Sequence, residues 1–270
     1  MAGWDDILRE LGDTPSQTDI VRRKYLKALS NYTGRNTIAY YSAFLTRSVA
    51  GTDINDSDMT GFMNALKGMD CSKGLDLILH TPGGSPAAAE AIVSYLRSKF
   101  HNDIRVIVPQ ISMSAGTMIA CAAKVIIMGK QSSLGPIDPQ FNGIPAYNIK
   151  AEFEEAKADL AVHPENAQYW AIKLQQYPAA FMKTALDAIE LSSNLITVWL
   201  GSCMYNSSIP EEKAIVENIV QQLNEHDRSK THGRHFNIDF CRDIGLKIEE
   251  MEKDNRLQDK ILSVHNAYLL

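Results

Sequence analysis

Residues 77–92, LILHTPGGSPAAAEAI, place an apolar strand, a glycine turn and a helix directly after one another. The first residues are continuously apolar, which is typical of a strand that is covered on both faces. Pro82 begins the turn, and Gly83 and Gly84 allow the backbone to approach another group closely. Pro86 is favoured in the first turn of a helix, so we expect the helix to begin there. The stretch is therefore one strand–turn–helix unit.

The same order of elements repeats on both sides of this unit. Apolar runs at 37–45, 104–109 and 124–129 predict strands, and residues 56–68 and 114–123 predict helices. Continuous apolar strands that alternate with helices form a parallel sheet with right-handed βαβ crossovers. We therefore expect an α/β fold of repeated βαβ units.

The pattern of apolar residues divides the chain into three parts. Residues 1–33 predict a helical leader, residues 34–147 form the α/β core, and residues 148–270 predict a mainly helical part of the same domain. No linker rich in Gly, Ser or Pro separates the last two parts. The leader and the C-terminal part both offer apolar faces that suit packing on the core or on a neighbouring subunit.

Composition excludes several classes of partner. The net charge of −5 leaves no basic stripe for nucleic acid. The four cysteines are far apart and form no Cys-x-x-Cys pair, so we expect no metal site and no disulfide framework. The stretch MAGWDDILRE has no apolar core of a signal peptide, and residues 195–205 are too short to span a bilayer. We expect a cytoplasmic protein with no membrane partner and no cofactor.

The serine at the start of the next helix is the first candidate for chemistry. Residues 108–118, VPQISMSAGTM, lead from a strand into that helix, with Ser114 at its head. By itself, Ser114 is typical of a helix cap, whose hydroxyl accepts a bond from an orphan N–H. Parallel strands nevertheless bring this turn and the turn at Gly83 to the same carboxyl edge of the sheet. A hydroxyl beside backbone N–H donors is what acyl transfer needs.

The glycine turn alone leaves two interpretations open. Its N–H groups can hold an anion, and it is equally compatible with a plain tight turn. The chain has no G-x-x-x-x-G-K-[ST] and no G-x-G-x-x-G motif at this position, which argues against a phosphate loop.

Taken together, TPGGSPAAAEAI and SMSAGTMIACAAKVIIMGKQSSLGPIDPQ resemble the Clp-fold serine peptidases, the superfamily of Clp protease and signal peptide peptidase A. Within it, the chain is most similar to the serine dehydrogenase proteinase family, also in RRKYLKALSNYTGRNTIAYYSAFL and THGRHFNIDFCRDIGL. The resemblance implies the Clp or crotonase type of fold, hydrolysis of a peptide or protein substrate through an acyl-enzyme, and a homo-oligomer. It leaves open whether an ATPase partner is needed.

The resemblance also assigns roles by position. It makes Ser114 the nucleophile and the N–H groups of Gly84 and Ala115 the oxyanion hole. Clp protease has its histidine in the segment that reads SSLGPIDPQ here, which contains Asp138 and no histidine. The serine dehydrogenase proteinase order of Ser, Asp and His makes Asp138 the residue that orients a later histidine. From the local sequence alone, an Asx turn explains Asp138 equally well.

Two of the histidines after Asp138 share one loop, residues 230–240 (KTHGRHFNIDF). His232 matches the family position just before a glycine-containing turn and the closing helix, so we favour it as the base. His235 in the same loop is its competitor, and a polar surface loop would explain both without any chemistry. The other three are His163, His226 and His265.

Three alternatives use the same fold. A Ser-Lys dyad, as in signal peptide peptidase A, would take Lys150 or Lys157 as the base, but the acidic residues around them favour solvated lysines. Crotonases use paired N–H groups to hold an acyl-CoA thioester enolate, and Ser114 at the helix head argues against that chemistry. A non-catalytic oligomeric scaffold would keep Ser114, Ala115 and Gly116 only for close helix packing.

Overall fold

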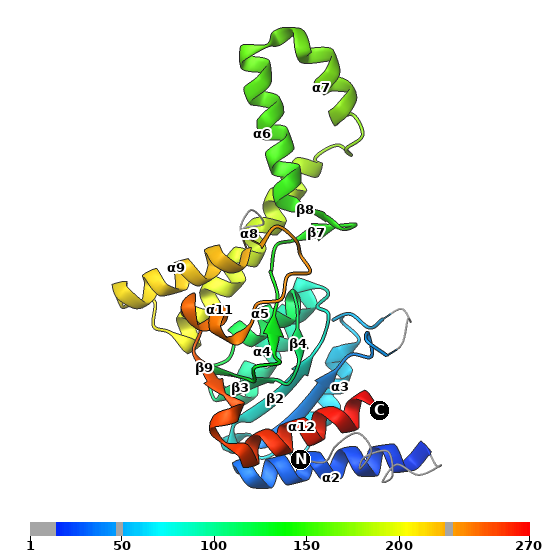
Figure 1. Cartoon of the computed structure of the whole chain (residues 1–270), viewed down its shortest axis with the longest axis vertical. Helices are drawn as coiled ribbons and strands as arrows, with labels where there is room; N and C mark the ends of the chain where they lie inside the picture. Colours follow the sequence, from blue (N-terminus) through cyan, green and yellow to red (C-terminus); the bar gives the residue numbers. More distant parts are fainter. Residues whose placement is uncertain (1–14, 47–50, 225–228) are drawn as a thin grey trace.

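A five-stranded parallel sheet forms the centre of the computed structural model (Figure 1). The model describes residues 15–46, 51–224 and 229–270; the start of the predicted leader and His226 lie outside the described residues. The strands are β1 (Asn36–Tyr41), β2 (Leu75–His80), β3 (Ile104–Val108), β5 (Val125–Met128) and β9 (Ile248–Glu250). They lie in the order β1-β2-β3-β5-β9, and every neighbouring pair is parallel. The predicted α/β fold of βαβ units is confirmed.

Helices cover both faces of this sheet. On one face α2 (Pro15–Thr33) and α12 (Asn255–Leu269) run side by side (Figure 1). On the other face lie α3 (Asp58–Leu66), α4 (Pro86–Phe100), α5 (Ala115–Cys121), α8 (Phe181–Trp199), α9 (Pro210–Asn224) and α11 (Ile238–Asp243). In β2, Leu77 and Leu79 pack with the second group of helices, whereas Ile78 packs towards α2 and α12. Burial on both sides explains why the strand is continuously apolar.

Two helices project away from the sheet at the top of Figure 1. They are α6 (Ala146–Val162) and α7 (Ala167–Leu174), and α8 returns from them to the core. The prediction of helix beyond residue 148 misses β9, which adds an edge strand beside β5. A strand of three residues is too short to show a periodic pattern.

Short elements connect the main ones. The strands among them are β4 (Ile111–Ser112), β6 (Ser133–Leu134), β7 (Gln140–Phe141) and β8 (Ile144–Pro145). The short helical turns are Cys71–Lys73, Pro164–Asn166, Leu200–Met204 and Met251–Lys253. β4 and β6 form a small parallel sheet of their own, which matters for the site described below.

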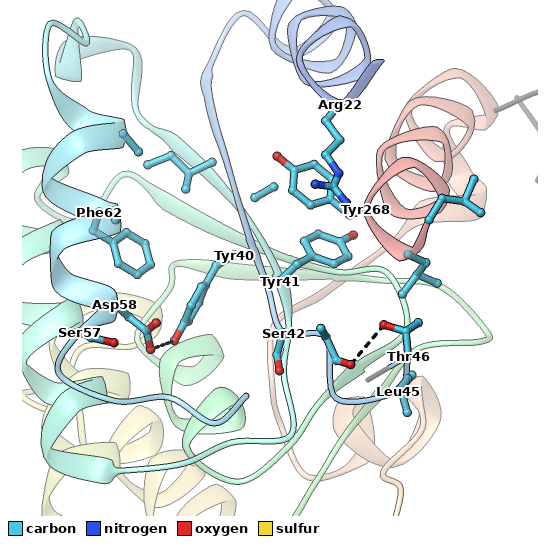
Figure 2. Close-up of a pocket in the computed structure, with 17 residues that line it drawn as sticks. Arg22, Tyr40, Tyr41, Ser42, Leu45, Thr46, Ser57, Asp58, Phe62 and Tyr268 are labelled. Carbon is cyan, nitrogen blue, oxygen red and sulfur yellow. Dashed lines mark hydrogen bonds between the residues drawn. The ribbon is translucent and has the colours of Figure 1, made fainter. Parts of the chain in front are cut away.

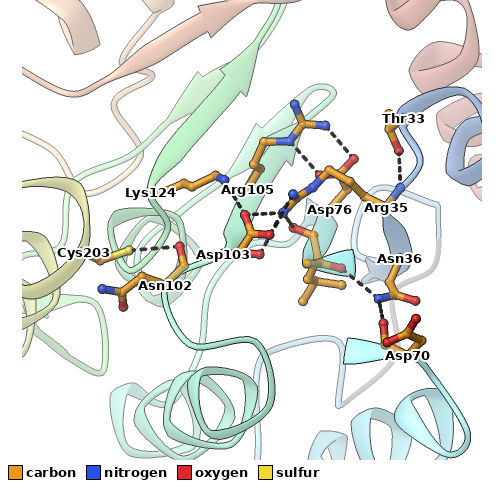
Figure 3. Close-up of polar contacts among 12 residues, drawn as sticks. Thr33, Arg35, Asn36, Asp70, Asp76, Asn102, Asp103, Arg105, Lys124 and Cys203 are labelled. Atoms are coloured by element: carbon orange, nitrogen blue, oxygen red, sulfur yellow. Dashed lines mark hydrogen bonds and ion pairs between the residues drawn. The ribbon is translucent and has the colours of Figure 1, made fainter. Parts of the chain in front are cut away.

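An ion network joins the amino ends of the strands (Figure 3). Buried Asp76 in β2 accepts hydrogen bonds from Nε of Arg35 and Nε of Arg105, each at 2.8 Å. Asp103 accepts from Arg35 Nη1 at 3.0 Å and pairs with Lys124. Its hydrogen bond with the Arg35 guanidinium lowers the pKa of the Asp103 carboxyl to about 2. Because these residues precede or begin strands, the network lies at the edge opposite the candidate catalytic turns.

Candidate active site

Two serines stand at the heads of α4 and α5, and only one of them is a helix cap. Ser85 accepts a hydrogen bond from the Ala88 N–H at 3.2 Å, and the helix begins at Pro86 as the sequence predicts. Ser114 has φ 52° and ψ −119°, and its side chain makes no capping bond. A residue other than glycine in such a conformation carries about 1–3 kcal/mol of strain. The capping interpretation of Ser114 is therefore wrong, and the strained turn between strand and helix resembles a nucleophile turn.

The glycine turn after β2 lies directly against Ser114. A Cβ atom at Gly83 would lie 2.6 Å from Ser114 Cβ, so only glycine fits there. On the other side of the turn, the Ile54 N–H donates to Gly83 O and Ile54 O accepts from the Ser85 N–H, each at 2.8 Å. A Cβ atom at Gly84 would lie 2.3 Å from Ile54 N. The turn is thus held between Ile54 and Ser114.

The two N–H groups predicted to form the oxyanion hole are both available. The hydrogen bonds of Ile54 to the neighbours of Gly84 turn the Gly84 N–H away from Ile54. Ala115 is the first residue of α5, where an N–H has no acceptor within the helix. Neither N–H donates to another residue in the described ranges, whereas the Gly116 N–H bonds to Met113 O at 2.8 Å. Free donors beside a serine are suited to stabilising an oxyanion.

Short strand pairs bring the histidine loop to the side of the sheet that carries Ser114. β4 ends two residues before Ser114 and pairs in parallel with β6. In β6, Leu134 pairs in turn with Phe236 of the histidine loop, through N–H···O bonds of 3.0 and 2.8 Å. The loop is therefore attached to the strand that neighbours the approach to Ser114.

Asp138 and His232 form a hydrogen bond although they are far apart in the sequence. The distance between His232 Nδ1 and Asp138 Oδ1 is 2.7 Å. Asp138 is fully buried, and its Oδ2 accepts from Gln140 Nε2 at 2.8 Å. Because an ionised carboxylate can only accept, Nδ1 of a neutral His232 carries the proton and Nε2 keeps a lone pair. The imidazole is 30% exposed, so the side chain is oriented by Asp138 and accessible, as a general base needs to be.

The competing histidine has an uncharged partner. His235 Nδ1 lies 2.7 Å from Ser133 Oγ, and the side chain is exposed. A hydroxyl cannot stabilise an imidazolium as a carboxylate does. The geometry therefore favours His232 over His235. His163 contacts Glu165 near the end of α6, and His265 lies in α12 on the opposite face of the sheet.

The lysines of the rival dyad lie on α6, which runs away from the sheet (Figure 1). Lys150 Nζ is 3.8 Å from Glu154 Oε1, one helical turn further on, and Lys157 is exposed. A lysine that acts as a base beside a serine must be desolvated. The structure does not bring either lysine into such an environment.

Thr117 is a support for the site that the sequence analysis misses. Its buried Oγ1 donates to Ser112 O at 2.9 Å and accepts from the Gly135 N–H at 3.0 Å. It thereby joins α5 to the loop that carries Asp138. Gln140, the second partner of Asp138, is also new. No sequence signal identifies either residue, since a threonine among small helical residues is typical of plain packing.

Other chemistry finds little support in the part of the chain that the structure describes. These residues contain no group of three His, Cys, Asp or Glu side chains that could hold a metal ion. All four cysteines are free thiols, and burial raises the pKa of Cys121 and Cys241, that of Cys241 to about 12. Within 15–46, 51–224 and 229–270, no helix has both the length and the apolarity to cross a membrane.

Sequence comparison matches the chain to one protein family. The profile of the ClpP-like SDH-type serine proteinases matches residues 22–164 of the 270, which is just over half of the chain. The matched range contains Gly84, Ser114 and Asp138. The histidine loop lies beyond it, so the matched range does not include His232.

Two curated relatives are uncharacterized proteins of Methanocaldococcus jannaschii. MJ0137 is 36% identical over 149 residues, which are 54% of this chain and 52% of the relative. MJ1495 is 45% identical over 75 residues, which are 28% of this chain and 25% of the relative. The chain thus spans about half the length of the first relative and a quarter of the second.

Proposed function

Because this chain belongs to the family of ClpP-like SDH-type serine proteinases, we propose that it cleaves peptide bonds through a Ser114 acyl-enzyme. Family membership supports a serine peptidase in general. The observation that carries the residue assignment is the strained, uncapped Ser114 at the head of α5. A cap would relax that backbone and bond its hydroxyl, whereas a nucleophile needs the hydroxyl turned outward.

In the proposed mechanism, His232 Nε2 removes the proton from Ser114 Oγ as the oxygen attacks the scissile carbonyl. The negative charge that develops on the carbonyl oxygen is held by the N–H groups of Gly84 and Ala115. His232 then passes its proton to the leaving amine, and water hydrolyses the acyl-enzyme by the same route in reverse.

Asp138 is a positioning residue in this mechanism. Its 2.7 Å bond to His232 Nδ1 keeps Nε2 free as the acceptor and stabilises the imidazolium. Its burial shields this charge from water, which strengthens the interaction. The bond from Gln140 to the other carboxylate oxygen fixes the orientation of the carboxylate plane.

Labelling with a fluorophosphonate probe tests the nucleophile. We expect the wild-type protein to react once per chain and Ser114→Ala not to react, because the probe traps an activated serine hydroxyl. Turnover of unstructured peptides should vanish in the same variant. Labelling of Ser114→Ala at the wild-type rate would refute the assignment, and so would a wild-type protein that neither reacts nor cleaves peptides.

Variants of the histidine loop and its carboxylate test the base. Asp138→Asn keeps the shape but favours the wrong tautomer of His232, so we expect kcat to fall by about 10⁴. His232→Ala should lower labelling to a similar extent. His235→Ala is the matched control from the same loop and should retain labelling, as should Lys150→Ala. The reverse result for the two histidines would make His235 the base.

We also propose that the protein is a homo-oligomer, in a reducing cytoplasm, that acts on peptide or protein substrates. Support comes from the projecting helices, where Val162 is 71% exposed and Tyr169 and Ile172 are each 59% exposed. Large apolar side chains that gather on a surface are typical of interfaces. The free cysteines suit a reducing compartment. A monomer of 30.0 kDa in light scattering at micromolar concentration would contradict the oligomer.

A further inference from the structure

The two edges of the main sheet are protected very differently. β9 has three residues, and two of them are Glu249 and Glu250. A short and charged edge strand resists pairing with another chain. β1 at the opposite edge is twice as long and reads NTIAYY, without a charge or a proline. Among the described residues only β2 pairs with β1, so by the same physical rule the other edge of β1 is a template for a further strand.

The backbone of β1 shows which of its groups are open. The Asn36 N–H bonds to Gly74 O at 3.2 Å and the Ser42 N–H bonds to His80 O at 2.9 Å. The backbone N–H and C=O groups of the even-numbered residues of β1 therefore bond to β2. Those of the odd-numbered residues point away from β2. The residues whose backbone groups point away from β2 are Thr37, Ala39 and Tyr41.

A cavity of about 580 Å³ runs along this free edge (Figure 2). We call it the β1 groove; β1 forms its floor, with Ala39 among the lining residues. Arg22 of α2 and Tyr268 of α12 line one wall, and Gly61 and Phe62 of α3 line the other. Its volume falls in the range of ligand pockets, about 300–1,000 Å³.

Gly61 is an independent sign that the groove is kept open. It lies inside α3, where glycine costs about 1 kcal/mol of helix stability relative to alanine. A Cβ atom there would meet nothing within 4 Å, and Gly61 is not among the glycines with positive φ. Neither packing nor backbone conformation therefore requires glycine. What the missing side chain provides is space in the wall of the groove.

We propose that the β1 groove binds an extended acidic segment of a partner protein, which adds to the sheet as a strand beside β1. Main-chain hydrogen bonds to Ala39 and Tyr41, which both line the groove, would supply affinity, and alternate side chains would face the two walls. This binding site is separate from Ser114, which does not line the groove, and it does not depend on the proposed peptidase activity.

Arg22 and Asp58 are the charged side chains among the residues that line the groove, and the position beside Arg22 is the one that favours an acidic side chain. Arg22 is held at the α2 and α12 wall, because its Nε donates to Ala267 O at 3.1 Å and its guanidinium lies 5.0 Å from the Tyr268 ring centroid. On the α3 wall, Asp58 already accepts from the Tyr40 hydroxyl at 2.7 Å and the Asn55 N–H at 2.9 Å. A carboxylate side chain therefore fits beside Arg22, and an apolar one fits beside Gly61.

The recessed position of β1 argues against a second copy as the occupant. Paired strands must approach to about 4.8 Å. The β1 strand of a second copy would lie equally deep between its own α3 and α12, so the helices would meet before the strands could pair. A single extended segment has no such walls and reaches the floor of the groove.

Fluorescence anisotropy with defined hexapeptides tests the proposal. The probe is a fluorescein-labelled peptide of alternating valine and glutamate, titrated with the full-length Ser114→Ala protein so that it is not cleaved. Gly61→Trp adds a large side chain to the groove wall at a position where a Cβ atom would meet nothing within 4 Å, and Gly61→Ala is the matched control. We expect Gly61→Trp to weaken binding at least about tenfold and Gly61→Ala to bind like the parent protein. Equal binding by the two variants would overturn the proposal.

Two further arms identify the binding mode. Alternate amides of the bound peptide face β1, and the others face away from it. Methylation of the first set should abolish binding, and methylation of the second set should leave binding unchanged. Arg22→Gln should weaken the glutamate peptide about threefold and leave a valine–glutamine peptide unchanged. Equal effects of the two methylation patterns would overturn the proposal even if Gly61→Trp failed to fold. A third pair of results would also overturn it: the wild-type protein binds no peptide, and Gly61→Trp has a lower mass than wild type in analytical ultracentrifugation. A second copy of the chain would then occupy the groove.

Discussion

Two neutral histidines on the α12 side of the sheet should make the fold sensitive to acid. His265 of α12 and His80 at the end of β2 have ring centroids 5.3 Å apart, and the Tyr41 hydroxyl lies 3.1 Å from His265 Nδ1. Burial lowers the pKa of both imidazoles, and the nearby His80 lowers that of His265 further, to about 4. Protonation of His265 therefore has to place a charge in a buried aromatic cluster.

The size of the effect follows from the pKa of His265. In the unfolded chain the imidazole titrates near 6.5, and in the folded chain near 4. Between these values the unfolded state binds more protons, so stability is complete above about pH 6.5 and falls as the pH decreases towards 4. Each pKa unit is worth about 1.4 kcal/mol, so acidification from pH 7.5 to 4.5 should cost about 2.5 kcal/mol through His265.

Urea unfolding of wild-type and His265→Phe proteins, followed by circular dichroism from pH 7.5 to 4.5, measures this loss. At pH 7.5 the variant should be less stable by about 1 kcal/mol, because it loses the hydrogen bond with Tyr41. At pH 4.5 it should be the more stable of the two. Exposed His163→Phe serves as the control and should keep the wild-type pH dependence. Parallel curves for wild type and His265→Phe would refute the assignment of acid sensitivity to His265.

Three further outcomes are expected. Gly83→Ala pushes a methyl group against Ser114, so fluorophosphonate labelling should disappear. The free energy of unfolding measured with urea should fall by about 1–3 kcal/mol. Asp76→Asn removes the buried carboxylate that pairs with Arg105 and with Arg35, and only Arg35 keeps another carboxylate partner, Asp103. It should cost about 3–5 kcal/mol in the same assay, while the folded fraction keeps its labelling rate. The pKa of Asp103 is lowered from 3.8 to about 2, so its contribution to stability is present above pH 3.8 and is lost as the pH falls through about 2, which Asp103→Asn should eliminate.

Local signals made the central sheet and its turns predictable. A strand that is buried on both faces is apolar throughout, and Pro82 with Gly83 marks the turn without any knowledge of the fold. Pro86 at the start of α4 is also a local feature, and it appears in the structure as the sequence predicts; the Ser85 cap beside it was not predicted. These features depend on neighbouring residues only, which is why one sequence suffices to find them.

Contacts between distant segments set the limit of prediction. The hydrogen bond between Asp138 and His232 joins residues 94 positions apart, and only the family resemblance brought the two together in advance. The pairing of Ile54 with the glycine turn had no sequence signal, because Ile54 lies in an irregular loop. Thr117 and Gln140 act through partners on other segments. Nothing in the local pattern around such residues distinguishes them from ordinary packing.

The backbone of Ser114 unites these observations, because strain persists only where the surroundings impose it. Gly83 lies against its Cβ, and β4 with β6 fixes the chain just before it. Thr117 ties the first turns of α5 to the loop of Asp138. The same contacts that hold φ at 52° therefore also set the position of the carboxylate that orients His232. A helix that merely needed a cap would relax to the geometry of Ser85, so the strain that the fold maintains at Ser114 supports the proposal that this serine is the nucleophile.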